Sequence, residues 1–156
     1  MLFQKRTRLK KINYQGQELY FITICTDFKR IIFMSDSELV KNILAFLIES
    51  AEKYHFKIWA YCFMPDHLHF LIEGTNSDSN LRKFISLFKQ KSGYWYKKSF
   101  GKKLWQESYY DHVLRQEENM KGIIKYIWEN PVRKKLVNNY WEYPYQGSFE
   151  INFDDL

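Results

Sequence analysis

Two strand-like segments joined by a short turn lie at the centre of the chain, and they constrain its fold more than any other feature. Residues 56–63 (FKIWAYCF) and 67–73 (HLHFLIE) are rich in aromatic and β-branched residues, which favour strands. Residues 64–66 (MPD) are typical of a turn, because proline fixes its own φ and aspartate hydrogen-bonds to the local backbone. The sequence therefore predicts an antiparallel β-hairpin over residues 56–73.

Further strand-like and helical segments flank this hairpin in a regular order. Strands are expected where β-branched and aromatic residues cluster, and helices where apolar residues recur at helical spacing. By these criteria we expect, in chain order, residues 20–26 (strand), 35–54 (helix), 81–95 (helix), 109–114 (strand) and 117–130 (helix). Pro131 is expected to end the last helix, because a residue before proline is pushed out of the helical region. The order is typical of a ferredoxin-like α+β fold, an antiparallel sheet with helices on one face, here followed by a C-terminal helix.

A single domain over residues 1–156 is expected from the length, and no repeat or low-complexity linker divides the chain. Hydrophobic residues make up 46% of the sequence, which argues against disorder. The apolar runs are far shorter than the roughly 20 residues that a membrane span requires. The basic N-terminus lacks the apolar block of a secretory signal. We therefore expect a cytoplasmic protein without membrane contact. Cys25 and Cys62 form no CxxC pair and are expected to be reduced, buried thiols.

Basic residues are concentrated in two segments of a chain whose formal net charge is +6. Residues 5–11 hold five basic residues and residues 82–103 hold eight, with no acidic residue in either segment, whereas residues 138–156 carry only acidic ones. This segregation favours an anionic partner such as nucleic acid, bound through its phosphates. A solvated lysine-rich helix face is the alternative interpretation.

Two histidines flank Leu68 on the second strand of the predicted hairpin. Because side chains alternate along a strand, His67 and His69 leave the same face, with their Cα atoms about 7 Å apart, and Leu68 points to the face where helices should pack. Two neutral imidazoles on a rigid strand suit a divalent metal. The alternative is a pair of half-exposed histidines without a ligand. We expect His55 to be structural and keep His112 as a minor candidate.

Tyr126 and Asn130 lie one turn apart on the last predicted helix, about 40° from each other around its axis. Both stand at the edge of the apolar stripe. A tyrosine is ordinarily a poor nucleophile because its pKa is near 10, but a metal that polarises a phosphate makes it usable. Three alternatives stay open: Tyr126 only packs, Asn130 only ends the helix, or Tyr109 or Tyr110 is the nucleophile.

Three phrases of the sequence carry a family resemblance: YCFMPDHLHFLIEG (residues 61–74), LWQESYYDHVLRQEEN, and YIWENPVRKKL (residues 126–136). Together they resemble the REP-associated tyrosine transposases, which belong to the IS200/IS605-like Y1 transposases of the HUH superfamily. The likeness covers roughly residues 14–149. A PDHLH phrase joined at this distance to YIxxNPVR is specific to that group.

The resemblance implies a role for each candidate residue. His67 and His69 match the HUH motif, and Tyr126 matches the single catalytic tyrosine. Asn130 matches a third ligand of Mg²⁺ or Mn²⁺, where sister transposases use glutamine. The implied reaction is a metal-dependent attack of Tyr126 on single-stranded DNA. It leaves a 5′-phosphotyrosine and a free 3′-OH, and a second 3′-OH can reverse it.

The resemblance also implies a DNA partner, namely imperfect hairpins of the REP type with single-stranded flanks. The candidate DNA-binding residues are Lys5, Arg6, Arg8, Arg82, Lys83, Lys89, Lys91, Arg115 and Arg133. A monomer is favoured, and a homodimer with exchanged tyrosine helices is the alternative.

Two other functions compete with this prediction. One is a hairpin-binding domain without chemistry, which would need neither a metal nor Tyr126. The other is a zinc hydrolase of small substrates, which would need a water-activating carboxylate near the histidines. Asp66 and Glu73 are the carboxylates nearest to them in the sequence.

Overall fold

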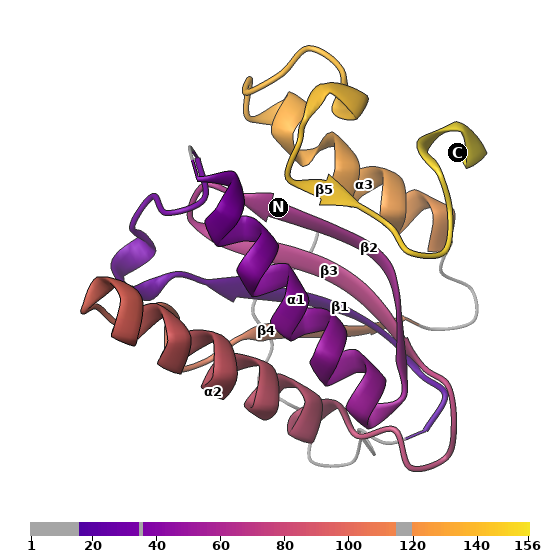
Figure 1. The fold of residues 1–156 in the computed structure, drawn as a ribbon. Coiled ribbons are helices and arrows are strands. Elements are labelled where there is room, and N and C mark those ends of the chain that lie inside the picture. The colour runs from indigo at the N-terminus through magenta and orange to yellow at the C-terminus, as the bar shows by residue number, and fades with distance from the viewer. Residues whose placement is uncertain (1–15, 35, 115–119) are drawn as a thin grey trace.

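The computed structural model describes residues 16–34, 36–114 and 120–156. Within these residues the strands pair antiparallel into one sheet, in the order β4-β1-β3-β2-β5 (Figure 1). The strands are β1 (Leu19–Cys25), β2 (Phe56–Met64), β3 (His67–Gly74), β4 (Tyr110–Leu114) and β5 (Gln146–Gly147). The helices are α1 (Ser37–Tyr54), α2 (Leu81–Phe100) and α3 (Met120–Arg133), with short 3-10 turns η1 (Asp27–Lys29), η2 (Tyr140–Glu142) and η3 (Phe153–Asp155).

The predicted hairpin of β2 and β3 forms the middle of the sheet. Met64 pairs with His67, so the turn between the strands consists of Pro65 and Asp66. On its other side β3 pairs with β1, which places Thr23 directly opposite His69. The two histidine positions are therefore enclosed by neighbouring strands on both sides, and the backbone that carries them is rigid.

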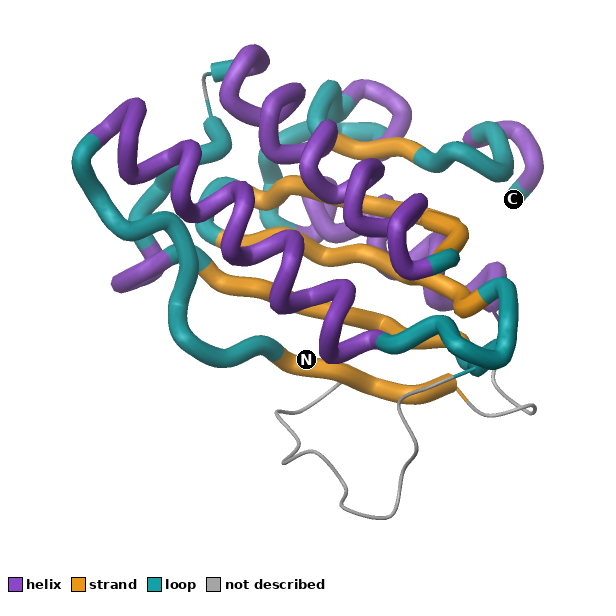
Figure 2. The backbone as a smooth tube through the Cα atoms, turned by 60° about the horizontal axis from the view of Figure 1, so that its bottom comes forward, coloured by secondary structure: helices purple, strands orange, loops and turns teal. Residues whose placement is uncertain are grey.

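The long helices α1 and α2 lie across one face of the sheet (Figures 1 and 2). Leu68, Phe70 and Ile72 alternate along β3 toward these helices, and all three are fully buried. His55 ends α1 in the left-handed conformation, with φ of 62°, and its backbone N–H bonds to Ala51. His55 thus has the structural role expected from the sequence.

The third helix, α3, covers the opposite face of the sheet, which carries the histidines (Figure 1). Ile124, Ile127 and Trp128 are buried there in a second hydrophobic core, as the apolar stripe predicts. The predicted end of this helix is wrong, because α3 continues through Pro131 to Arg133. A proline in the last turn removes only one N–H donor from the helical hydrogen bonds. The N–H of Lys134 donates to the carbonyl of Asn130 and completes the last turn.

None of the helices in the described ranges is long and apolar enough to cross a membrane.

Candidate active site

The inner nitrogens of the two histidines converge on the α3 side of the sheet. His67 Nε2 and His69 Nε2 are 3.0 Å apart, and the two rings lie nearly at right angles, with an interplanar angle of 78°. Two ligands at adjacent corners of an octahedral ion, each about 2.1 Å from the metal, are themselves about 3.0 Å apart. The spacing of the nitrogens therefore fits two ligands of a single divalent cation.

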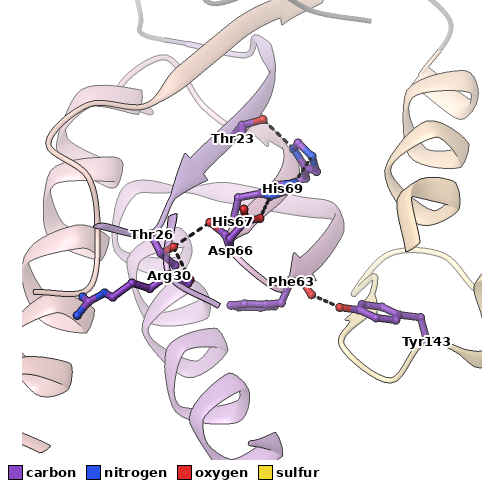
Figure 3. A network of polar contacts seen from close by, with 8 residues as sticks. All are labelled: Thr23, Thr26, Arg30, Phe63, Asp66, His67, His69 and Tyr143. Atoms are coloured by element: carbon purple, nitrogen blue, oxygen red, sulfur yellow. Dashed lines mark hydrogen bonds and ion pairs between the residues drawn. The ribbon is translucent and has the colours of Figure 1, made fainter. Parts of the chain in front are cut away.

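The outer nitrogens of both imidazoles have oxygen partners (Figure 3). His67 Nδ1 contacts Asp66 Oδ1 at 2.6 Å, and His69 Nδ1 contacts Thr23 Oγ1 at 2.7 Å. Metal-binding histidines usually donate their second ring N–H to such an acceptor, which fixes both the tautomer and the ring orientation. With Nδ1 donating, each Nε2 presents its lone pair toward the other. Asp66 and Thr23 thus position the pair.

The surroundings of the imidazoles favour their neutral form. Burial lowers the pKa of His67, although the hydrogen bond that Nδ1 donates to the Asp66 carboxylate acts in the opposite direction. The pKa of His69 lies well below its usual range. Burial is the main cause, and positive charge at His67 and Arg133 acts in the same direction. A neutral imidazole is the form that binds a metal, so both rings are ready to act as ligands at neutral pH.

The helix α3 brings Tyr126 to the edge of this histidine face. The ring centroid of Phe21 lies 5.4 Å from that of His69 and 6.2 Å from that of Tyr126, so both rings contact the same phenylalanine. Arg133, two turns further along α3, places its guanidinium 4.1 Å from the centroid of the Tyr126 ring. Arg133 also donates to the backbone carbonyl of Tyr126 at 2.6 Å. These contacts hold the Tyr126 ring half-buried on the face of the sheet that carries the histidines.

Asn130 lies between Tyr126 and the last turn of α3, and only 6% of it is exposed. Its side-chain amide makes no hydrogen bond to any residue that the structure describes. An amide oxygen is among the ligands that Mg²⁺ and Mn²⁺ accept, so this position is consistent with a ligand role. No third histidine, cysteine or carboxylate joins the pair within the described part of the chain. The remaining corners of a bound ion would thus fall to an amide, water or phosphate oxygen.

Residues 15–130, about three quarters of the chain, match the model of the IS200-like transposase family. The chain belongs to the IS200-like transposase family. A Haemophilus influenzae protein assigned as a REP-associated tyrosine transposase is 25% identical over 143 residues, which span 83% of this chain and 78% of the relative. The family predicted from the sequence is thereby confirmed.

Two solved structures share the fold of this transposase. A REP-associated tyrosine transposase bound to a REP hairpin aligns with a TM-score of 0.72 at 18% identity, covering 90% of this chain and 82% of that one. A protein of Deinococcus radiodurans R1 assigned as a transposase aligns with a TM-score of 0.53 at 21% identity, covering 80% and 97% respectively. At these identities the likeness concerns the fold, and it confirms the predicted α+β class.

The structure separates the candidate DNA-binding residues of this transposase into different environments. Arg82 and Lys89 line one cleft between α2 and residues 107–109. Lys89 Nζ donates to the carbonyls of residues 106, 107 and 108, at 2.6, 3.0 and 3.4 Å, so it also fastens this loop to α2.

Lys91 pairs with Glu49 of α1 at 2.5 Å. Lys83 is exposed at the start of α2. The remaining candidates besides Arg133 lie outside the described residues: Lys5, Arg6, Arg8 and Arg115.

The competing nucleophiles differ in their positions. Tyr109 packs against the core on the α1 and α2 side, away from the histidines. Tyr110 pairs with Thr23 across β1 and β4, so it shares the histidine face and stays a geometrical rival of Tyr126. His112 lies on this face too, opposite Phe21.

The carboxylates that a zinc hydrolase would need are poorly placed. Asp66 contacts the outer nitrogen of His67, on the side away from the inner nitrogens. Glu73 lies four residues beyond His69 on β3, a distance of about 13 Å along a strand. Neither carboxylate is positioned to activate a water between the two Nε2 atoms, which weakens the hydrolase interpretation.

Proposed function

We propose that this chain is a metal-dependent nuclease that cuts and rejoins single-stranded DNA, with Tyr126 as the nucleophile. The observation that carries the proposal is the convergence of the Nε2 atoms of His67 and His69, 3.0 Å apart, on the face covered by the helix of Tyr126. Membership of a transposase family supports a DNA-processing role. The site and the family therefore point to the same class of chemistry.

The proposed metal is Mg²⁺ or Mn²⁺, with His67, His69 and Asn130 as its protein ligands. Mixed nitrogen and oxygen ligation suits Mn²⁺ and is acceptable to Mg²⁺. When bound, the cation supplies positive charge that polarises the scissile phosphate. Asp66 and Thr23 keep both imidazoles oriented.

In the proposed reaction the phenol oxygen of Tyr126 attacks the phosphorus and loses its proton to solvent. The bond from phosphorus to the 3′ oxygen breaks, and that oxygen takes up a proton to become a free 3′-OH. The 5′ side of the strand remains joined to Tyr126 as a phosphodiester. Attack by another 3′-OH restores the phenol and joins the strands, so the reaction needs no external energy source.

The proposed substrate is hairpin DNA with a single-stranded flank, because a structural relative was solved bound to a REP hairpin. Arg82 and Lys83 at the start of α2 and Arg133 at the end of α3 are suited to phosphate contacts. Lys89 and Lys91 already bond to carbonyls and to Glu49, so they have less capacity for phosphate.

We propose that each chain works as a monomer. The helix α3 packs Ile124, Ile127 and Trp128 onto the sheet of its own chain, which supports a site formed within one chain. A dimer with exchanged helices would have to open this core first.

Labelled single-stranded hairpins incubated with the protein and Mn²⁺ test the function. We expect a covalent adduct that resists denaturation, its loss in Tyr126→Phe and upon chelation of the metal, and its retention in the control Tyr110→Phe. A hairpin-binding domain without chemistry would bind the DNA and form no adduct. Adduct formation by Tyr126→Phe would contradict the assignment of the nucleophile.

A further inference from the structure

The segment that follows β1 presents apolar side chains to solvent next to the histidine pair. Phe28 is 88% exposed, and Ile31 and Met34 in the same segment are exposed as well. Clustered exposed apolar side chains mark interaction sites more often than chance positions do. We propose that the ring of Phe28 stacks on an unpaired base of the DNA strand held at His67 and His69. This inference rests on the proposed function and adds a base-binding position to it.

The backbone holds Phe28 in an unusual conformation. Phe28 has φ of 56° and Lys29 has φ of 50°, both in the left-handed region that bulky residues avoid. The other non-glycine residues with positive φ in the described ranges, His55 and Lys135, stand at the ends of helices, where this conformation is common. Phe28 and Lys29 are instead the central residues of a tight turn that the Arg30 N–H closes onto the Asp27 carbonyl at 3.3 Å. Glycine or asparagine usually occupies such positions, so a phenylalanine there is strained, and strain of this kind is concentrated at functional sites.

Hydrogen bonds fasten this segment to the turn that precedes His67 (Figure 3). Thr26 bonds to the carbonyl of Asp66 through both its N–H and its hydroxyl, at 3.0 Å each. Further along, the N–H groups of Ile32 and Phe33 donate to the carbonyl of Pro65, at 2.8 and 3.1 Å. The segment is thus fixed at both ends to residues 65 and 66, so the exposed ring is presented by a rigid backbone. Little conformational entropy is then lost when a base stacks on it.

The charge beside Phe28 suits a nucleic acid. Lys29 is exposed next to Phe28 and places a positive charge in the same segment. Surfaces that bind single strands combine basic groups, which follow the backbone, with aromatic rings, on which bases stack. Lys29 and Phe28 are adjacent residues of these two kinds, and they closely follow Cys25, which pairs with His67 across β1 and β3. A nucleic-acid base is therefore a better partner for the exposed Phe28 ring than the apolar surface of another protein.

The affinity of fluorescent oligothymidylate in the presence of Mn²⁺ tests this inference, measured by anisotropy in a Tyr126→Phe background that prevents cleavage. Phe28→Leu keeps an apolar side chain but removes the ring, and we expect it to bind about 5- to 100-fold more weakly. Phe28→Tyr should restore the affinity. The matched control is Trp141→Leu, an aromatic residue on η2 that is 58% exposed, and it should bind like the parent.

A second readout locates the contact. Oligothymidylate carrying iodouracil should photocrosslink to the peptide that contains Phe28, and the crosslink should be lost in Phe28→Leu. The inference is overturned if Phe28→Leu binds like the parent, if Phe28→Tyr is as weak as Phe28→Leu, or if Phe28→Leu only converts a dimer to a monomer in sedimentation.

Two outcomes separate the stacking position at Phe28 from the nuclease function of Tyr126. A Tyr126 adduct that forms normally in Phe28→Leu, with unchanged DNA affinity, removes the stacking position and leaves the function intact. Loss of affinity in Phe28→Leu without any Tyr126 adduct in the wild type supports the stacking position and removes the nuclease function.

Discussion

The chemistry of the two imidazoles depends on residues that would not touch a metal themselves. Asp66 and Thr23 occupy the outer nitrogens of His67 and His69, at 2.6 and 2.7 Å, and so keep each Nε2 free as a ligand atom. Without these acceptors either ring could rotate or protonate its inner nitrogen. The two oxygens, one on the turn and one on β1, would therefore act on the proposed reaction through the histidines.

Asp66→Ala is expected to weaken Mn²⁺ binding about 10- to 100-fold, the usual effect of removing such a partner. Isothermal titration calorimetry measures this change directly. The control Glu52→Ala removes the same charge from an exposed position on α1 and should leave the affinity unchanged. Equal Mn²⁺ affinity in Asp66→Ala and the wild type would show that Asp66 does not orient His67.

The sequence was sufficient to predict the histidine pair but not the partner of His69. Alternation along a strand places His67 and His69 on one face, and the full burial of Leu68 on the other face agrees with it. Thr23 lies 46 residues away and meets His69 only through the register of β1 against β3, for which no local pattern exists. The position of Phe28 likewise depends on backbone torsions that no residue pattern indicates.

At the scale of elements, α3 and the segment after it close the histidine face of the sheet. The apolar stripe of α3 predicted that the helix packs, but amphipathicity does not tell which face of a sheet it covers. Trp128 of α3 donates to the carbonyl of Gly147 on β5 at 3.2 Å, and Tyr140 stacks on the Trp128 ring. The C-terminal residues therefore fasten the helix that carries Tyr126 to the β5 edge of the sheet.

The Tyr143 hydroxyl is one of the anchors of this C-terminal segment. It donates to the backbone carbonyl of Phe63 on β2 at 2.5 Å, and burial raises the pKa of the phenol, so it stays protonated. Tyr143→Phe leaves a buried carbonyl without this donor, and we expect the free energy of unfolding to fall by about 1–3 kcal/mol. Urea denaturation measures the change. Tyr94→Phe, at an exposed position on α2, is the control and should unfold like the wild type. Unchanged stability in Tyr143→Phe would show that this bond does not anchor the segment.

At the scale of the whole molecule, two cores lie on opposite sides of one sheet. The core beneath α1 and α2 stabilises the strands, and the core beneath α3 holds the helix of Tyr126 on the face that carries the histidines. The segregation of charge along the chain predicted an anionic partner. Charge alone could not distinguish a lysine that meets phosphate from one that pairs internally, as Lys91 does with Glu49.

Hairpin binding should depend on salt, because phosphate contacts release counterions. Arg82→Gln is expected to weaken hairpin binding and to lower the slope of log affinity against log salt concentration by about one. Anisotropy titrations at several salt concentrations give this slope. Lys53→Gln, an exposed charge on α1, serves as the control with an unchanged slope. If the two variants gave the same slope, phosphate contacts at the start of α2 would be excluded.

We propose that a cation held by His67 and His69 faces the phenol of Tyr126 from the same chain. Anomalous diffraction from crystals grown with Mn²⁺ tests this arrangement. We predict a peak about 2.1 Å from both Nε2 atoms, with the Asn130 amide oxygen as a further ligand and the Tyr126 hydroxyl directed toward the ion. A peak bound elsewhere, or a Tyr126 hydroxyl directed away from the imidazole pair, would exclude a metal site of this kind.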